Sequence, residues 1–284
     1  MSERKQTLTI QEATDLAIQH LTAGRLPQAE SVCNQILQTY PKQHVALHLL
    51  GVIAHRVGKN DIAKTFFMKT LEIQPDYVEA HNDLGGILRG LGQPDKALIS
   101  FETAISLKPE DAVAHSNRSN ALLDLGKLDA AVAGYEKALS INPDLYETYS
   151  NLGNALKEMG KLQEAINSYQ VAINLRPDFT IAHFNLGNAF RDIGRVEDSL
   201  ASFRTALHID PDFSSAHFNL GDTLRNQGKF EEALQVFELA DTPGCRAGVM
   251  ECLFVLGEYE KFKKFQKASL EKDKKNISAA SVSA

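Results

Sequence analysis

Apolar residues recur at intervals of three and four through most of this chain, with short polar stretches between the runs. In the segment HNDLGGILRGLG, Leu84, Ile87, Leu88 and Leu91 follow this spacing, and residues 94–107 show the same period. Such spacing gathers side chains on one face of an α-helix, whereas a half-buried strand would alternate. The pattern therefore predicts successive amphipathic helices joined by short turns.

The helices come in pairs that repeat every 34 residues, and four kinds of residue keep this period. The prolines are Pro41, Pro75, Pro109, Pro143, Pro177 and Pro211. The glycines are Gly24, Gly58, Gly92, Gly126, Gly160, Gly194 and Gly228. The small residues are Ala29, Ala63, Ala97, Ala131, Ala165, Ser199 and Ala233, and the aromatic residues are Phe67, Phe101, Tyr135, Tyr169, Phe203 and Phe237. One helix pair cannot bury its own apolar face, so such pairs stack into a solenoid.

Each repeating position has a physical role in a helix hairpin. Gly92 suits the turn between two antiparallel helices, because glycine adopts a positive φ without a Cβ penalty. Pro109 ends a second helix, because proline lacks an N–H donor and disfavours helix at the preceding residue. A small residue such as Ala97 lets two helices approach closely. Asp76, three residues before Glu79, predicts a capping box at the start of the next helix.

These positions resemble the tetratricopeptide repeat. The residues that carry the resemblance in one repeat are Ala80, Leu84, Gly85, Gly92, Ala97, Phe101, Ala104 and Pro109. The resemblance covers seven repeats and implies an all-α fold, a right-handed superhelical solenoid of tetratricopeptide helix hairpins. The first repeat departs from the pattern, since Ala17 replaces the glycine that follows leucine and Cys33 replaces the aromatic residue. Ser119 and Ser199 are further departures that stay small.

The repeat register slips after Ala240, where Gly257 follows Gly228 by 29 residues instead of 34. The following residues predict a shortened hairpin and a helix with seven lysines, which would cover the last apolar face of the stack. We therefore divide the chain into a flexible N-terminus (1–9), seven 34-residue hairpins (10–245), a degenerate hairpin with a lysine-rich capping helix (246–275), and a disordered tail (276–284).

Two rows of polar residues and one row of basic residues recur on the first helix of the repeats. The first row comprises Asp83, Asn117, Asn151, Asn185 and Asn219. The second row, three residues later, comprises Asn120, Asn154, Asn188 and Asp222, and the basic row comprises Lys157, Arg191 and Arg225. A spacing of three places all of them on one helix face.

Asparagine is a mediocre helix former, so its recurrence in mid-helix calls for an explanation. One explanation is hydrogen bonding between repeats that orders the stack. The other is a ladder of amides, each offering a donor and an acceptor to the backbone of an extended peptide. We favour peptide binding for the first row and structural roles for part of the second. The basic row would add a preference for acidic segments, and Phe184 and Phe218 would supply apolar contacts or pack against neighbouring repeats.

The segment AHFNLGNAFRD (182–192) is similar in sequence to the repeat arm of O-linked N-acetylglucosamine transferases. In that family the first helices line a concave groove, whose asparagine ladder binds the backbone of substrate proteins. The resemblance extends this role to Asn117, Asn151, Asn185 and Asn219. The catalytic region of those enzymes would follow the repeats, where this sequence has too few residues for it. A chaperone-type carboxylate clamp is not expected, since its lysine position holds His48, Asn82, Ser116, Ser150, Phe184 and Phe218.

No catalytic motif is present in the sequence, whether a GxSxG elbow, a GxxxxGK[ST] loop or an HExxH pair. His81, His115, His183 and His217 share one position in four repeats. Equivalent positions of stacked helices lie ~8–10 Å apart, too far to share a metal ion whose ligands lie within about 2–2.2 Å. We therefore expect no enzymatic activity, no metal and no cofactor, and we attribute these histidines to packing between hairpins.

Composition and charge exclude several further classes. Apolar residues at 43% exclude a disordered chain, and a net charge of −6 disfavours binding to nucleic acid. No apolar run approaches the ~18 residues that cross a bilayer, and the N-terminal residues lack a secretory signal. Cys33, Cys245 and Cys252 form no CxxC pair, which argues against a disulfide framework. We expect a cytoplasmic monomer with no membrane partner.

Two functions remain open from the sequence. The first is a non-enzymatic scaffold that binds an extended segment of a partner protein in an asparagine-lined groove. The second is the substrate-recognition arm of an O-linked N-acetylglucosamine transferase-like or other modifying enzyme, whose catalytic part is not in this chain.

Overall fold

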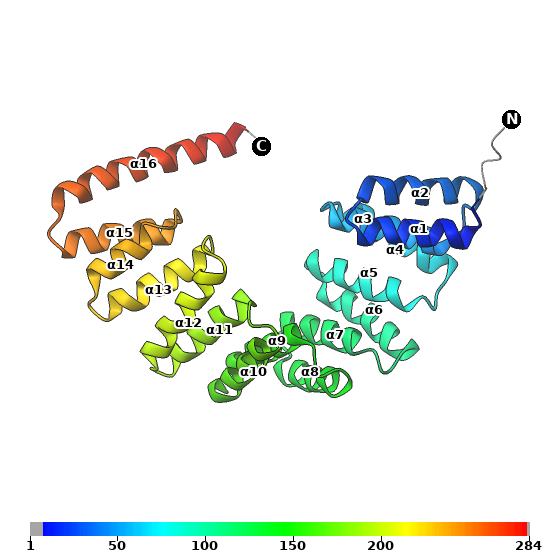
Figure 1. Ribbon diagram of the computed structural model, residues 1–284, viewed down its shortest axis with the longest axis horizontal. Helices are drawn as coiled ribbons and strands as arrows, with labels where there is room; N and C mark the ends of the chain where they lie inside the picture. The colour runs from blue at the N-terminus through cyan, green and yellow to red at the C-terminus, as the bar shows by residue number, and fades with distance from the viewer. Residues whose placement is uncertain (1–7, 283–284) are drawn as a thin grey trace. The chain divides into compact units, whose positions relative to one another are not determined.

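The structure of the protein is a computed structural model that describes residues 8–282, with side chains placed for residues 8–272 (Figure 1). All regular elements within 8–282 are α-helices, which agrees with the all-α fold class predicted from the sequence. The chain divides between Pro143 and Asp144 into two compact units, which are described separately below.

The first unit holds four helix pairs. They are α1 (Ile10–Thr22), α2 (Leu26–Thr39), α3 (His44–Arg56), α4 (Asn60–Ile73), α5 (Val78–Gly90), α6 (Pro94–Leu107), α7 (Ala112–Asp124) and α8 (Leu128–Ile141). Each odd-numbered helix packs against the next helix in the chain, and α3, α5 and α7 also contact the pair before them. The unit is therefore a stack of helix hairpins.

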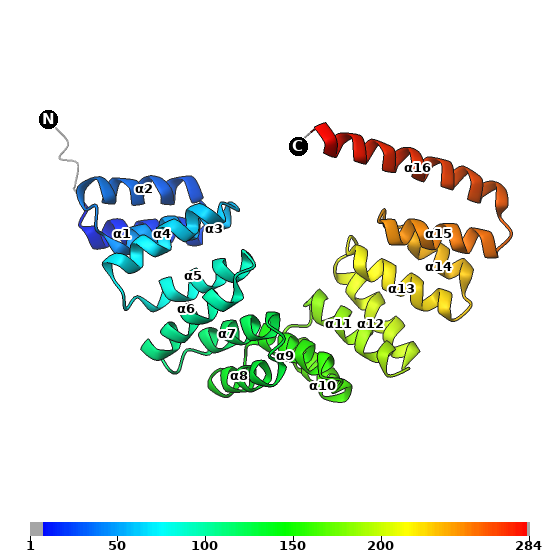
Figure 2. The same ribbon diagram turned by 180° about the vertical axis from the view of Figure 1, so that it is seen from behind.

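The second unit holds the remaining helices. They are α9 (Tyr146–Glu158), α10 (Leu162–Leu175), α11 (Thr180–Asp192), α12 (Val196–Ile209), α13 (Ser214–Asn226), α14 (Phe230–Phe237), α15 (Pro243–Val255) and α16 (Tyr259–Val282). Its first helices α9, α11, α13 and α15 contact one another in sequence, and α10, α12 and α14 pack against them (Figure 2). The predicted hairpin stack is thus present in both units.

The turn between the two helices of each pair is closed by glycine. At Gly92 the backbone φ is 71°, and the next amide, that of Gln93, donates to the carbonyl of Leu88 at 2.9 Å. A side chain at this φ would be strained, which explains why glycine keeps the period here. All seven turn glycines predicted from the 34-residue period have positive φ, as does Gly257 in the last turn.

A second glycine position holds the two helices of a pair together. Gly187 on α11 faces Phe203 on α12, whose side chain is fully buried. A Cβ atom built at Gly187 would lie 2.7 Å from two carbons of this ring. Gly51, Gly85, Gly153 and Gly221 face the aromatic residue of their own repeat in the same way. The small and aromatic positions of the repeat are therefore one packing unit.

We expect Gly187→Ala to lower the free energy of unfolding, because the new methyl group overlaps the Phe203 ring. Overpacking of this kind costs about 1–3 kcal/mol, partly offset by the better helix propensity of alanine. The first repeat holds the smaller pair Ala17 and Cys33, both fully buried. Urea denaturation should therefore show that Gly187→Ala with Phe203→Cys loses less stability than the two single changes added together. Strict additivity would contradict this packing account.

The helix N-termini differ from the sequence prediction. The expected capping box of Asp76 and Glu79 does not form, since the N-cap residue of α5 is Tyr77 and it has no side-chain cap. A capping box is present instead at α1, where Thr9 Oγ1 accepts from the Glu12 amide and Glu12 accepts from the Thr9 amide. Thr9 is thus the N-cap residue of α1, although it belongs to the segment 1–9 that was predicted to be flexible. Residues 1–7 of that segment lie outside the described range.

The C-terminal part also differs in detail. The short helix α14 leaves room for α15 to begin at Pro243, where Thr242 Oγ1 accepts from the Cys245 amide. The sequence predicted a shortened hairpin followed by a separate lysine-rich helix. In the structure α15 and α16 form the hairpin, and α16 is itself the lysine-rich helix. Phe262 and Phe265 of α16 pack against the core of the last helix pairs. The helix runs on to Val282 and so includes residues 276–282 of the segment that was predicted to be a disordered tail.

Candidate functional site

The polar rows predicted from the sequence lie on the first helices, and all of their side chains are half-buried. In the first unit α5 carries Asp83, and α7 carries Asn117 and Asn120. In the second unit the rows comprise Asn151 and Asn154 on α9, Asn185 and Asn188 on α11, and Asn219 and Asp222 on α13. Since α9 contacts α11 and α11 contacts α13, the second unit brings three repeats of both rows onto one surface. We call this surface the first-helix face.

Hydrogen bonds connect the two rows across neighbouring repeats of the second unit. Asn185 Nδ2 donates to Asn154 Oδ1 at 3.0 Å, and Asn219 Nδ2 donates to Asn188 Oδ1 at 2.9 Å. Asn185 and Asn219 are thus each held by the second-row amide of the repeat before them. Each retains one N–H and its carbonyl oxygen, and neither oxygen accepts a hydrogen bond from another described residue.

The second row is itself fixed from the helix behind it. Asn154 Oδ1 also accepts from the Tyr169 hydroxyl at 2.8 Å, and Tyr169 is fully buried. Burial raises the pKa of Tyr169, so its hydroxyl stays protonated as a donor. In the next repeat Phe203 has no hydroxyl, and Arg191 donates to Asn188 Oδ1 instead, at 3.1 Å. The second-row asparagines therefore have the structural role that the sequence suggested for part of this row.

We expect Tyr169→Phe to lower the free energy of unfolding by only ~0.5–1.5 kcal/mol, the net value of one hydrogen bond. Asn154 Oδ1 would keep Asn185 as its donor, so no buried acceptor is left without a partner. Urea denaturation of this variant beside Tyr40→Phe, whose side chain is half exposed, measures the difference. A loss above ~3 kcal/mol would mean that the hydroxyl supports more than Asn154.

In the first unit the hydrogen bonds made by the two polar rows are less regular than in the second unit. Asp83 Oδ2 lies 2.8 Å from His48 Nε2 of the preceding repeat, so this carboxylate is held by an imidazole instead of an amide. Asn120 Oδ1 accepts from the Tyr135 hydroxyl at 2.6 Å. The second-row position before Asn117 is Gly86, and Asn117 makes no hydrogen bond with another described side chain.

Most of the basic row is already neutralised. Lys157 Nζ lies 3.3 Å from Asp192 Oδ2, in the repeat that follows it. Arg225 pairs with Asp222 and, at 2.6 Å, with Glu251. Arg191 is the exception, because it forms no ion pair with a carboxylate among the side chains placed in the structure. The row is therefore weaker in positive charge than the sequence alone suggested.

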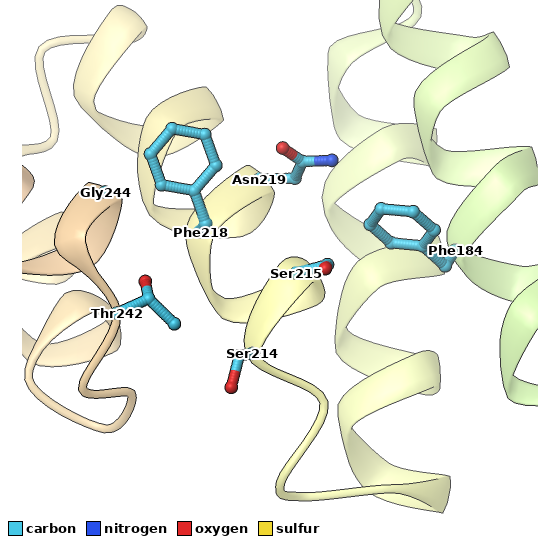
Figure 3. A pocket seen from close by; sticks show the side chains of 7 residues that line it. All are labelled: Phe184, Ser214, Ser215, Phe218, Asn219, Thr242 and Gly244. Atoms are coloured by element: carbon cyan, nitrogen blue, oxygen red, sulfur yellow. The ribbon is translucent and has the colours of Figure 1, made fainter. Parts of the chain in front are cut away.

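An open pocket lies at the last repeats of the first-helix face (Figure 3). Its volume is about 410 Å³. The residues that line it are Phe184, Ser214, Ser215, Phe218, Asn219, Thr242 and Gly244. Asn219 thus belongs both to the first row and to the wall of this pocket. The sequence identified Phe184 and Phe218 as candidate apolar contacts, whereas the pocket itself was not predicted.

The repeated histidines have a structural partner. His81, His115, His183 and His217 each place Nε2 2.8–2.9 Å from the carbonyl oxygen of the proline six residues earlier. These hydrogen bonds tie the loop between repeats to the following helix. Where side chains are placed, no three His, Cys, Asp or Glu residues gather closely enough to hold a metal ion. Among residues 8–282, no helix has the length and apolar character that crossing a membrane requires.

Comparison with known protein families agrees with this repeat geometry. A family described as "TPR repeat" matches residues 119–160 and 153–191, and families described as "Tetratricopeptide repeat" match residues 44–77, 78–111 and 186–244. Together these matches cover well over half of the chain. The chain belongs to the tetratricopeptide repeat family. No curated protein sequence matches it in the corresponding search.

Solved structures of tetratricopeptide repeat proteins share the fold. A crystal structure of MamA is 25% identical, with a TM-score of 0.51 over 57% of this chain and 94% of MamA. A second MamA structure is 24% identical, with a TM-score of 0.51 over 60% of this chain and 92% of that chain. The APC/C hetero-tetramer Cut9–Hcn1 is 16% identical, with a TM-score of 0.72 over 88% of this chain and half of that chain, and shows similarity of fold alone.

Tetratricopeptide repeats are typical of non-catalytic scaffolds that bind other proteins, and no catalytic domain is evident in residues 8–282. The first-helix face fits such a role, because it offers polar groups in a regular array. The pairing of the two asparagine rows was open in the sequence, since residue spacing fixes a helix face but not the direction of an amide. The pocket had one signal in the sequence, the register slip after Ala240.

Proposed function

We propose that this protein is a scaffold that binds an extended segment of a partner protein along the first-helix face. One observation carries the proposal: Asn185 and Asn219 are each oriented by a second-row asparagine that occupies one N–H. Because a fixed amide loses little further conformational entropy when it binds, it is a better ligand than a mobile one. The remaining N–H and carbonyl oxygen match the C=O and N–H groups of a peptide backbone.

The spacing of the repeats matches an extended peptide. Neighbouring packed helices stand ~8–10 Å apart, and an extended chain advances ~3.3 Å per residue. One first-row amide would therefore meet the backbone about every third residue. Each hydrogen bond contributes only ~0.5–1.5 kcal/mol net, so the ladder would bind many sequences weakly instead of one sequence tightly. Within the second unit the proposed rungs are Asn151, Asn185 and Asn219.

A preference for acidic segments is a smaller part of the proposal. Lys157 already pairs with Asp192, and Arg225 with Glu251. An acidic side chain of the peptide would have to replace these carboxylates, so its ion pair with Lys157 or Arg225 would add little to the affinity for the peptide. Arg191 is the one basic residue of the row that an acidic side chain of the partner would meet without such a competitor. A single aspartate near the middle rung is therefore the acidic preference that we propose.

The second candidate function is a substrate-recognition arm for a modifying enzyme. It is favoured by the run of first-row asparagines in consecutive repeats, which resembles the repeat arm of O-linked N-acetylglucosamine transferases. Both candidates use the same face and the same backbone contacts. They differ in the fate of the bound segment, since partners of a recognition arm would carry a covalent modification near the bound residues. Mass spectrometry of purified partners distinguishes the two.

Titration with an array of synthetic ten-residue peptides, followed by NMR of the asparagine side-chain amide groups, tests the proposed function. Peptides that bind should shift the side-chain NH₂ signals of Asn185 and Asn219, whereas Asn167, exposed on the second helix α10, should stay unchanged. Signal changes confined to second helices such as α10 and α12 would place binding elsewhere and contradict the proposal.

A further inference from the structure

An aromatic position on the first helices is covered by a ring from the next repeat, and the covering ring lies 29 residues later in the sequence. In the second unit the ring of Phe213 packs edge to face against Phe184, with centroids 5.0 Å apart. In the first unit Tyr77 covers His48 in the same way, with centroids 5.1 Å apart. The position continues with Phe218, one repeat after Phe184.

No aromatic ring of the described residues covers Phe218 in this way, because the 34-residue register ends after Ala240. The residue 29 positions after Phe218 is Ala247, which lies within α15 instead of a loop. Phe218 still packs on Phe237 beneath it, with centroids 6.3 Å apart, as Phe184 packs on Phe203 at 5.8 Å. Phe218 is nevertheless 38% exposed.

The open position is the pocket shown in Figure 3. On one side Gly244 approaches so closely that a Cβ atom there would lie 2.9 Å from the Phe218 ring. On the other side the pocket reaches Phe184 and Asn219. Its volume of about 410 Å³ is at the low end for small-ligand sites and suits one ring-sized side chain. Among residues 8–272, no cationic side chain lines the pocket.

We propose that this pocket takes an aromatic side chain of the segment bound along the first-helix face. The inference rests on the proposed function, because it needs the peptide backbone to reach Asn219 in the same wall of the pocket. The partner's ring would take the place against Phe218 that Phe213 takes against Phe184. The first-row amides would then bind the backbone of many peptides, whereas the pocket would select peptides that have an aromatic residue at one position.

The selectivity can be measured with fluorescein-labelled twelve-residue Ala/Ser/Thr peptides in which one guest residue is moved through every position. Fluorescence anisotropy should give a guest position at which phenylalanine binds about tenfold to a hundredfold more tightly than alanine, from burial of its ring. Aspartate at that position should bind no better than alanine, because no cation lines the pocket.

The variant Phe218→Ser tests the assignment to this pocket. Serine already occupies the same position at Ser116 and Ser150, where it is buried, so the fold accepts it. We expect this variant to reduce the preference for phenylalanine over alanine to less than about threefold, with the alanine peptide bound as before. The matched control Ile99→Ser removes another exposed apolar side chain, on α6, and should leave the preference unchanged.

The outcomes separate this inference from the proposed function. An equal phenylalanine preference in Phe218→Ser and wild type would overturn the inference while the scaffold function stands, and so would a preference for aspartate at the selected position. Absence of binding by every peptide to the wild type would overturn the scaffold function and the inference with it.

Discussion

Replacing Phe203 with alanine is expected to lower the free energy of unfolding of the second unit by about 3–5 kcal/mol, the usual cost of removing a buried phenylalanine ring. The Phe203 side chain is fully buried between Gly187 and Phe184, and it belongs to the core that joins α11 to α15. Since Gly187 has no side chain with which to fill the space, the cavity would remain. Urea denaturation followed by circular dichroism measures the change.

The matched control for this prediction is Ile181→Ala in the same unit. About half of Ile181 is exposed (49%), so its removal should cost less than ~1 kcal/mol. Because each repeat of a solenoid depends mainly on its neighbours, hydrogen exchange in Phe203→Ala should accelerate most in α11–α14. An equal loss of stability in the two variants would mean that the aromatic position does not hold the hairpin together.

Replacing Asn185 and Asn219 together with alanine is expected to weaken the binding of extended peptides by about 5-fold to 150-fold. This range corresponds to the loss of two hydrogen bonds of ~0.5–1.5 kcal/mol each. The protein should stay folded, because Asn154 keeps the Tyr169 hydroxyl and Asn188 keeps Arg191 as donors. Alanine is also the better helix former. Fluorescence anisotropy and circular dichroism measure affinity and helicity on the same sample.

A control for the ladder is Asn167→Ala, which removes an exposed amide from α10, outside the first-helix face. It should leave peptide affinity unchanged. If the double variant Asn185→Ala/Asn219→Ala binds peptides as tightly as the wild type, the first row orders the stack and does not contact the ligand. The proposal of a backbone-binding ladder would then be wrong.

The fold could be predicted because its determinants recur at fixed intervals. Gly92 and its equivalents close turns, and the pairing of Gly187 with Phe203 follows from residue types that keep one period. The capping prediction at Asp76 was wrong because α5 begins one residue later than the pattern requires. Its N-cap residue is Tyr77, and the Asp76 carboxylate accepts a hydrogen bond from the Gln74 side chain instead.

The candidate site could be predicted only in part. Residue spacing placed Asn154 and Asn185 on the same face of two successive first helices, but the hydrogen bond between them depends on side-chain direction, which spacing does not predict. The neutralisation of Lys157 likewise comes from Asp192, 35 residues away in sequence, so the basic row looked more positive than it is. Where the period breaks, after Ala240, periodicity no longer predicts packing, and the pocket beside Phe218 was not predicted.

The central claim is that first-row amides bind the backbone of an extended peptide, and a double-mutant cycle tests it most directly. One peptide that binds the wild type is prepared with successive backbone amides replaced by esters, which removes one N–H donor at a time and keeps the side chains. Each peptide is then titrated against wild type and Asn219→Ala. We predict one ester position that weakens binding to the wild type by about 2-fold to 10-fold and leaves binding to Asn219→Ala unchanged. Ester effects that are equal in the two proteins at every position would contradict the claim.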